Sequence, residues 1–80
     1  MKPADTLIWI AEIFEEPKEN ITPETPRDAI PGWDSMGILA LMAALDKDFD
    51  MLLSAEDIQK FKAVGDILEL LRRNGKLDSE

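Results

Sequence analysis

Hydrophobic residues recur at helical spacing in four segments of the chain, and no stretch alternates apolar and polar residues for long enough to predict a strand. The pattern predicts an all-α fold, a small four-helix bundle with a long loop between the first two helices and a short third helix. The first helix is expected from about Asp5 to about Glu16, because Pro17 ends it. Trp9 and Ile13 are expected to pack under the long loop rather than to form a partner patch. The core positions of this helix are Leu7, Ile10, Ala11 and Phe14.

The loop from Pro17 to Trp33 is long for a connection in so small a protein, and it is rich in proline. Such a loop has to be pinned to the bundle, and Ile21 and Ile30 are the expected apolar anchors. Trp33 is either a third anchor or a residue that faces a partner at the start of the next helix.

The second helix has the strongest helical pattern of the chain and is expected from Asp34 or Ser35 to about Asp48. Its core face holds Ile38, Leu41, Met42, Leu45 and Phe49. The opposite face is small, apolar and poorly charged near the helix start. It holds Met36, Ala40, Ala43 and Lys47, with Leu39 at one edge and Gly37 and Ala44 at the other. A solvated face normally carries Glu and Lys, so this face predicts a contact surface, and packing beneath the long loop is the alternative.

A short third helix is expected from Ala55 to Lys60, with Ser54 as its N-cap and Asp57 as the acid of a capping box. The fourth helix is expected from Val64 to about Arg73, and Asn74-Gly75 stops it. Its core positions are Val64, Ile67, Leu68 and Leu71. Residues 1–80 are predicted to form one domain, in which 76–80 are a frayed tail.

Composition excludes several kinds of chemistry. The 80 residues have a formal net charge of −8 and contain neither Cys nor His, so disulfides, a thiol nucleophile, imidazole zinc sites and a Ser-His-Asp triad are all excluded. An acidic chain is repelled by nucleic acid and favours basic protein partners. The apolar stretch 7–14 is too short to span a bilayer, and no targeting signal is apparent, so we expect a cytoplasmic monomer.

The candidate chemical site is Gly32-Trp33-Asp34-Ser35-Met36-Gly37 at the start of the second helix. A Ser at the first helical position lies beside backbone N–H groups that have no intrahelical partner and beside the positive end of the helix dipole. A phosphodiester attached there gains on the order of 0.3–1 kcal/mol. The alternative is that the Ser only caps the helix.

This arrangement resembles the acyl carrier protein family over nearly the whole chain. The features that carry the resemblance are the helix order, the long loop with buried aliphatic residues, and the segment from Asp34 to Phe49, which opens on Asp-Ser-Met. The resemblance implies that Ser35 carries a 4′-phosphopantetheine arm, which a phosphopantetheinyl transferase adds from coenzyme A. The thiol of the arm would hold the cargo as a thioester, so the chain would be a non-catalytic carrier and would need no Cys or His of its own.

The resemblance also implies roles for other residues. Asp34 would help the transferase to recognise the site. The expected partner-binding residues are Trp33, Met36, Leu39, Ala43, Asp46 and Asp48. The two acids among them would pair with basic patches on acyl-loading and acyl-transfer enzymes. The acyl chain would lie in a pocket lined by Leu41, Met42, Leu45, Ile58, Phe61 and Ile67.

Some positions depart from the family pattern. Carriers of general fatty acid synthesis usually have acidic residues where this chain has Gly37, Ala40 and Lys47, and they do not have a residue like Trp33 before the motif. These departures predict a specialised member that serves a lipid, polyketide or cell-envelope pathway. The Asp-Ser-Met-Gly tetrad also occurs in D-alanyl carrier proteins, so an aminoacyl cargo is an alternative. An unmodified helical interaction module is a further alternative.

The alternating acids Asp46, Asp48 and Asp50 mimic the opening of an EF-hand loop. Met51 stands where that loop needs a glycine, and Phe49 belongs to the core face of the helix. The sequence therefore predicts a solvated helix end and no metal site.

Overall fold

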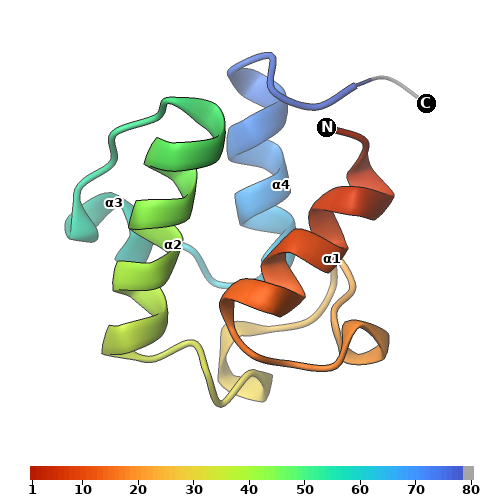
Figure 1. Ribbon diagram of the computed structural model, residues 1–80. Coiled ribbons are helices and arrows are strands. Elements are labelled where there is room, and N and C mark those ends of the chain that lie inside the picture. Colours follow the sequence, from red (N-terminus) through yellow and green to blue (C-terminus); the bar gives the residue numbers. More distant parts are fainter. Residues whose placement is uncertain (79–80) are drawn as a thin grey trace.

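The computed structural model describes residues 1–78, in which four α-helices surround a shared apolar core (Figure 1). The helices are α1 (Pro3–Ile13), α2 (Ser35–Phe49), α3 (Ala55–Gln59) and α4 (Val64–Arg73). Two 3₁₀ turns, η1 (Lys18–Asn20) and η2 (Arg27–Ala29), lie in the long loop. Within residues 1–78 there is no strand beyond one isolated bridge between Pro26 and Ala63. The predicted all-α fold with a short third helix is confirmed.

The core draws residues from all four helices and from the long loop. Ile21 and Ile30 are each 3% exposed, so the predicted loop anchors are confirmed. Of the predicted core face of α2, only Met42 is half-buried rather than buried. In α1, Leu7 is also half-buried, and the neighbouring Thr6 is fully buried. A polar residue can be buried there because the Thr6 hydroxyl donates a hydrogen bond to the Lys2 carbonyl at 2.9 Å. The buried apolar residues are Ile10, Ala11, Phe14, Ile21, Ile30, Trp33, Ile38, Leu41, Leu45, Phe49, Ile58, Val64, Ile67 and Leu71.

The end of α1 differs from the prediction. The helix stops at Ile13, before Pro17, because Glu15 adopts a left-handed conformation with φ 53°. The Glu16 N–H donates to the Ala11 carbonyl at 2.9 Å and the Glu15 N–H donates to the Glu12 carbonyl at 3.3 Å. These bonds form a Schellman cap, which usually has glycine at the left-handed position. Because Glu stands there, the sequence did not reveal the stop.

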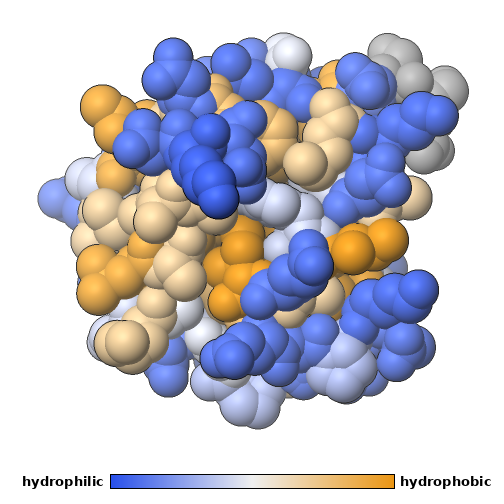
Figure 2. All heavy atoms as spheres, viewed as in Figure 1, coloured by the Kyte–Doolittle hydropathy of each residue, from blue (hydrophilic) through white to orange (hydrophobic). Residues whose placement is uncertain are grey.

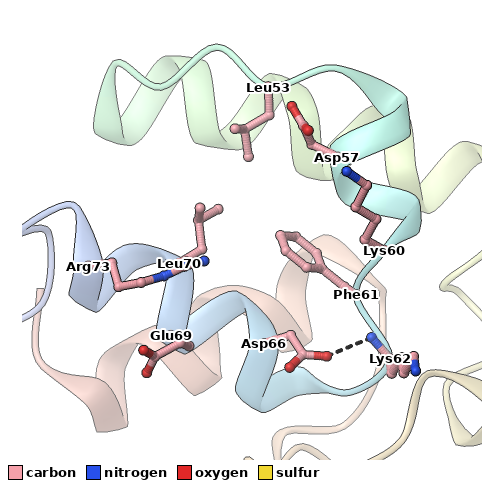
Figure 3. Close-up of a pocket in the computed structure, with 9 residues that line it drawn as sticks. All are labelled: Leu53, Asp57, Lys60, Phe61, Lys62, Asp66, Glu69, Leu70 and Arg73. Carbon is pink, nitrogen blue, oxygen red and sulfur yellow. Dashed lines mark hydrogen bonds between the residues drawn. The ribbon is translucent and has the colours of Figure 1, made fainter.

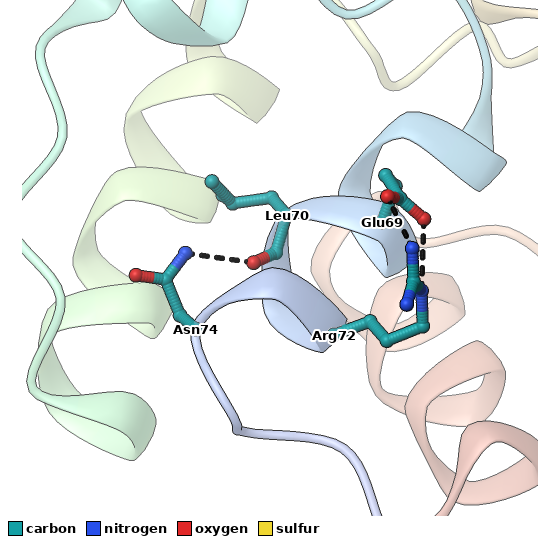
Figure 4. A network of polar contacts seen from close by, with 4 residues as sticks. All are labelled: Glu69, Leu70, Arg72 and Asn74. Carbon is teal, nitrogen blue, oxygen red and sulfur yellow. Dashed lines mark hydrogen bonds and ion pairs between the residues drawn. The ribbon is translucent and has the colours of Figure 1, made fainter.

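Side chains cap the later helices much as predicted. The Ser54 hydroxyl accepts from the Asp57 N–H at 3.1 Å, and the Asp57 carboxylate accepts from the Ser54 N–H at 3.4 Å, which confirms the capping box of α3. At the end of α4, the Asn74 side-chain amide donates to the Leu70 carbonyl at 2.8 Å (Figure 4). Gly75 follows with φ 69°, as the predicted Asn-Gly stop requires.

The two ends of the described chain lie side by side (Figure 1). The Met1 ammonium donates to the Lys76 carbonyl at 3.1 Å, and the Asp78 N–H donates to the Met1 carbonyl at 2.9 Å. The sequence predicted a frayed tail from residue 76, whereas in this structure Lys76 and Asp78 pair with the start of the chain. The last two positions of the predicted tail, Ser79 and Glu80, lie outside the described residues.

No helix within 1–78 is both long and apolar enough to cross a membrane.

Candidate cofactor-attachment site

Ser35 is the first residue of α2 and is exposed to solvent. The residue that caps the helix is Asp34, whose carboxylate accepts from the Gly37 N–H at 2.9 Å. The Ser35 hydroxyl is therefore not needed to cap the helix. The first N–H groups of a helix lack intrahelical partners and form the positive end of its dipole, so a phosphodiester on Ser35 would lie where an anion is stabilised.

Trp33 anchors the chain just before this helix start. Its side chain is 5% exposed, and its ring stacks on that of Phe14 with centroids 4.9 Å apart. The Arg27 guanidinium lies 5.8 Å from the centre of the Trp33 ring. The same guanidinium group donates a hydrogen bond to the Gln59 carbonyl at 3.1 Å. Trp33 is thus a third loop anchor. The expectation that it faces a partner is wrong, because its side chain is buried against α1.

Gly37 packs against the long loop and is not on the exposed face of α2. A Cβ atom on Gly37 would lie 1.9 Å from the Gly32 carbonyl oxygen, so no larger residue fits without moving the backbone. Gly32 is held just as closely, since its own Cβ would meet the Phe14 carbonyl oxygen at 2.1 Å. In the sequence, Gly37 was interpreted as the loss of an acid from a partner surface. The structure gives this glycine a packing reason, which spacing along the chain did not reveal.

Most of the apolar positions on the opposite face of α2 are open to solvent, whereas Ala44 at its edge is half-buried. Met36 is 74% exposed and Leu39 is 58% exposed, and Ala40, Ala43 and Asp46 are exposed as well. Figure 2 shows apolar side chains gathered over the side of the molecule along which α2 runs. Apart from Trp33, the predicted partner residues therefore lie at the surface.

Asp48 is exposed, but it also has a contact inside the protein. The Trp9 indole N–H donates to the Asp48 carboxylate at 2.7 Å, and the Trp9 ring meets that of Phe49 edge-on, with centroids 5.1 Å apart. Trp9 thus packs against α2, and the prediction that it packs under the long loop is wrong. Spacing within α1 could not show which neighbour would cover this residue.

The alternating acids form no metal site. Residues 1–78 contain no group of three or more His, Cys, Asp or Glu side chains placed to hold a metal ion. Asp50 instead takes a left-handed conformation with φ 55° and ends α2.

Comparison with known proteins identifies the family. An acyl carrier protein of Clostridium perfringens is 34% identical over 62 residues, which cover 78% of this chain and 82% of that protein. The chain belongs to the acyl carrier protein family. Another such protein, from Bdellovibrio bacteriovorus, is 38% identical over 45 residues, which cover 56% of this chain and 58% of that one. The solution structure of a holo acyl carrier protein from Geobacter metallireducens matches with a TM-score of 0.68 at 27% identity, over 100% of this chain and 98% of that one. No family model matches the chain.

An acyl carrier protein carries an acyl group on a phosphopantetheine arm and is not itself an enzyme. The Ser35 hydroxyl at the start of α2 is exposed, so it is accessible for the attachment of such an arm. The chain has no Cys, and it needs none, because the reactive thiol belongs to the cofactor. A small hollow of about 250 Å³ adjoins this helix start and is bordered by Phe14, Asp34 and Met36.

The residues predicted to line an acyl pocket lie together in the core or at its edge. Four of them, Leu41, Leu45, Ile58 and Ile67, have no exposed surface. The other two, Met42 and Phe61, are half-buried and pack against the same core. An acyl chain among these residues would have to separate helices that are packed together in this structure.

Proposed function

We propose that Ser35 is the residue that carries the 4′-phosphopantetheine arm and that the chain shuttles its cargo between partner enzymes as a thioester. The observation that supports this most is the division of roles at the start of α2. Asp34 caps the helix, and this leaves the exposed Ser35 hydroxyl available for modification. The helix dipole would stabilise the phosphodiester that results.

Partner recognition is proposed to use the exposed side of α2. Met36, Leu39 and Ala43 would contact partner enzymes, and Asp46 would pair with basic residues on them. Asp34 would contribute its charge to recognition by the phosphopantetheinyl transferase. Because Asp48 already accepts a hydrogen bond from Trp9, it has less freedom to turn toward a partner.

Mass spectrometry of the intact protein tests the attachment site. The purified chain would be incubated with coenzyme A and a broad-specificity phosphopantetheinyl transferase. We expect one phosphopantetheine adduct on the wild type and none on Ser35→Ala. An adduct that persists in Ser35→Ala, or none on a wild-type chain whose folding has been checked by circular dichroism, would contradict the proposal. Retention of a partner by the unmodified α2 face would then favour an interaction module.

The cargo is proposed to belong to a dedicated lipid, polyketide or cell-envelope pathway. Support comes from Ala40 and Lys47, which are exposed and non-acidic at positions where general carriers are acidic. Gly37 no longer contributes to this argument, because packing against Gly32 accounts for it. The Asp-Ser-Met-Gly tetrad keeps an aminoacyl cargo as the alternative. The mass of the thioester on protein purified from its native cell would distinguish the two classes of cargo.

Three further properties stay predictions of the sequence: that the protein is cytoplasmic, that it is a monomer, and that it forms one domain.

A further inference from the structure

We propose that a groove between α1 and α2 holds the phosphopantetheine arm while no partner enzyme is docked. The inference rests on the proposed role of Ser35 and adds where the arm lies. The groove is made of two hollows, of about 250 Å³ and about 450 Å³. Ile13 and Ala40 line both hollows, so the two adjoin. Asp34 and Met36, the neighbours of Ser35, border the near end, so the groove begins at the attachment point.

The two helices run in opposite directions along this α1–α2 groove. The near hollow is lined by Glu15 from the end of α1 and by Met36 from the start of α2. The far hollow is lined by Trp9 and Asp48, which lie further back in α1 and further along α2. The hydrogen bond of 2.7 Å from the Trp9 indole to the Asp48 carboxylate joins the two helices there. The groove thus leads from Ser35 to a contact that links its two sides.

The length of the groove suits the arm. From phosphorus to sulfur, the arm has as many backbone bonds as about four residues of polypeptide, so its extended length is roughly 15 Å. An α-helix rises about 1.5 Å per residue, so the same length measured along α2 from Ser35 ends near Ala44. Ala44 lines the far hollow. An arm attached to Ser35 therefore spans both hollows without passing the Trp9–Asp48 contact.

The lining of the groove leaves room for a chain that is partly apolar. On the α2 side the lining residues Ala40 and Ala43 are small and exposed, and Ala44 is half-buried. On the α1 side, Ile13 is half-buried and faces both hollows. The arm has a pair of geminal methyl groups and several methylenes. Their contact with these side chains would remove apolar surface from water, which favours the bound arm.

The charges along the groove favour a neutral occupant. Glu12, Glu15 and Asp48 border it, and they would repel an anionic chain. Beyond its phosphate, the arm carries two amides and a hydroxyl but no charge. Glu12 and Lys47 form no ion pair within residues 1–78, so a carboxylate and an ammonium are available to hydrogen-bond the amide groups of the arm.

A hollow between α3 and α4 is larger, at about 560 Å³, but it does not begin at Ser35 (Figure 3). None of its lining residues belongs to α2 or to the loop before Ser35. The α1–α2 groove also overlaps the proposed partner surface, because Met36 and Ala43 belong to both. A partner docked on that surface and an arm at rest in the groove would therefore exclude each other.

NMR spectra of the apo and holo protein test this placement. The mass of the intact chain would first show that Ser35 carries the arm. We expect methyl shifts at Ile13, Ala40 and Ala43 on loading, and nuclear Overhauser contacts from the geminal methyl groups of the arm to Ile13. The methylene beside the sulfur should contact Ala44. A chain without an adduct would contradict the proposed function and this inference with it, whereas a loaded chain without these contacts would overturn the resting site alone.

A pair of alanine variants tests whether the groove holds the arm. Ala43→Gln places a longer neutral side chain in the groove and should weaken the contacts about threefold or more, because their intensity follows the fraction of arms in the groove. The matched control, Ala4→Gln, makes the same change at an exposed position of α1 that lines neither hollow, and it should keep the wild-type intensities. Both alanines are exposed and Gln is a good helix former, so neither change threatens the fold. Equal intensities in the two variants, or arm contacts at Leu53 and Leu70 in the hollow of Figure 3, would overturn the proposal.

Discussion

The indole ring of Trp33 lies nearly parallel to the phenyl ring of Phe14, with centroids 4.9 Å apart and an interplanar angle of 15°. Phe14 is the C-cap residue that directly follows α1, and Trp33 directly precedes the Asp34-Ser35 pair that opens α2. Stacked aromatic pairs add about 0.5–1.5 kcal/mol beyond the apolar area that they bury. The position of Ser35 is therefore fixed by α1 as well as by its own helix.

Removal of the Trp33 ring should destabilise the protein. Trp33→Ala should lower the free energy of unfolding by about 3–5 kcal/mol, because a large buried ring is lost, and Trp33→Phe should lower it by less. Urea denaturation followed by far-ultraviolet circular dichroism would measure both changes. A Trp33→Ala protein that is as stable as the wild type but is loaded slowly by the transferase would show instead that Trp33 serves a partner.

Gly37 should not accept even a methyl group. In Gly37→Ala the new Cβ would meet the Gly32 carbonyl oxygen, so we expect a loss of about 1–3 kcal/mol of stability, which is typical of overpacking. Ala40→Glu is the matched comparison, because it places an acid at an exposed position of the same helix and should change stability by no more than about 0.5 kcal/mol. Thermal unfolding of the two variants would test the contrast, and equal melting temperatures would contradict the packing argument.

Substitutions at Asp34 separate helix capping from recognition. Asp34→Ala should cost about 0.5–2 kcal/mol of stability because the hydrogen bond to the Gly37 N–H is lost, whereas Asp34→Asn keeps a good cap and should be close to wild type. If the transferase recognises the charge of Asp34, it should attach phosphopantetheine to both variants more slowly than to the wild type. The initial rate of adduct formation, measured by intact mass, would decide this, and a normal rate in Asp34→Asn would mean that the charge is not read.

The hydrogen bond between Trp9 and Asp48 should appear as an energetic coupling. A double-mutant cycle with Trp9→Phe and Asp48→Ala should give a coupling of about 0.5–1.5 kcal/mol in the free energy of unfolding. Asp46→Ala in place of Asp48→Ala provides the control and should show no coupling with Trp9→Phe. Equal couplings for the two acids would indicate a general charge effect rather than this contact.

The carboxyl of Glu69 should titrate at a pH set by Arg72. The Arg72 hydrogen bond lowers the pKa of Glu69 below its ordinary 4.5, and the charge of Arg73 contributes less. Arg72→Gln should therefore raise the Glu69 pKa more than Arg73→Gln does, as an NMR titration of the side-chain carboxyl carbon would show. Because the folded-state pKa is the lower one, the pair contributes to stability above the unfolded pKa, and this contribution is lost as the pH falls through the folded pKa.

Local signals in the sequence were enough for much of the fold. The core face of α2, the capping box at Ser54, and the stop at Asn74-Gly75 depend on residues within a few positions of one another. The same holds for the Asp-Ser pair at the start of α2. Such features follow from helical periodicity and from hydrogen bonds between neighbours, so a single sequence contains them.

Contacts between distant segments decided the rest. Glu15 ends α1 without the glycine that usually marks such a cap, and Trp33 turns inward to stack on Phe14. Trp9 finds its partner 39 positions away, in Asp48. By itself, the sequence determined where the helices form and which hydroxyl opens α2. Only the tertiary structure decided that Trp33 and Gly37 are buried beside the exposed face of that helix, because burial depends on what packs against a residue and not only on its spacing along the chain.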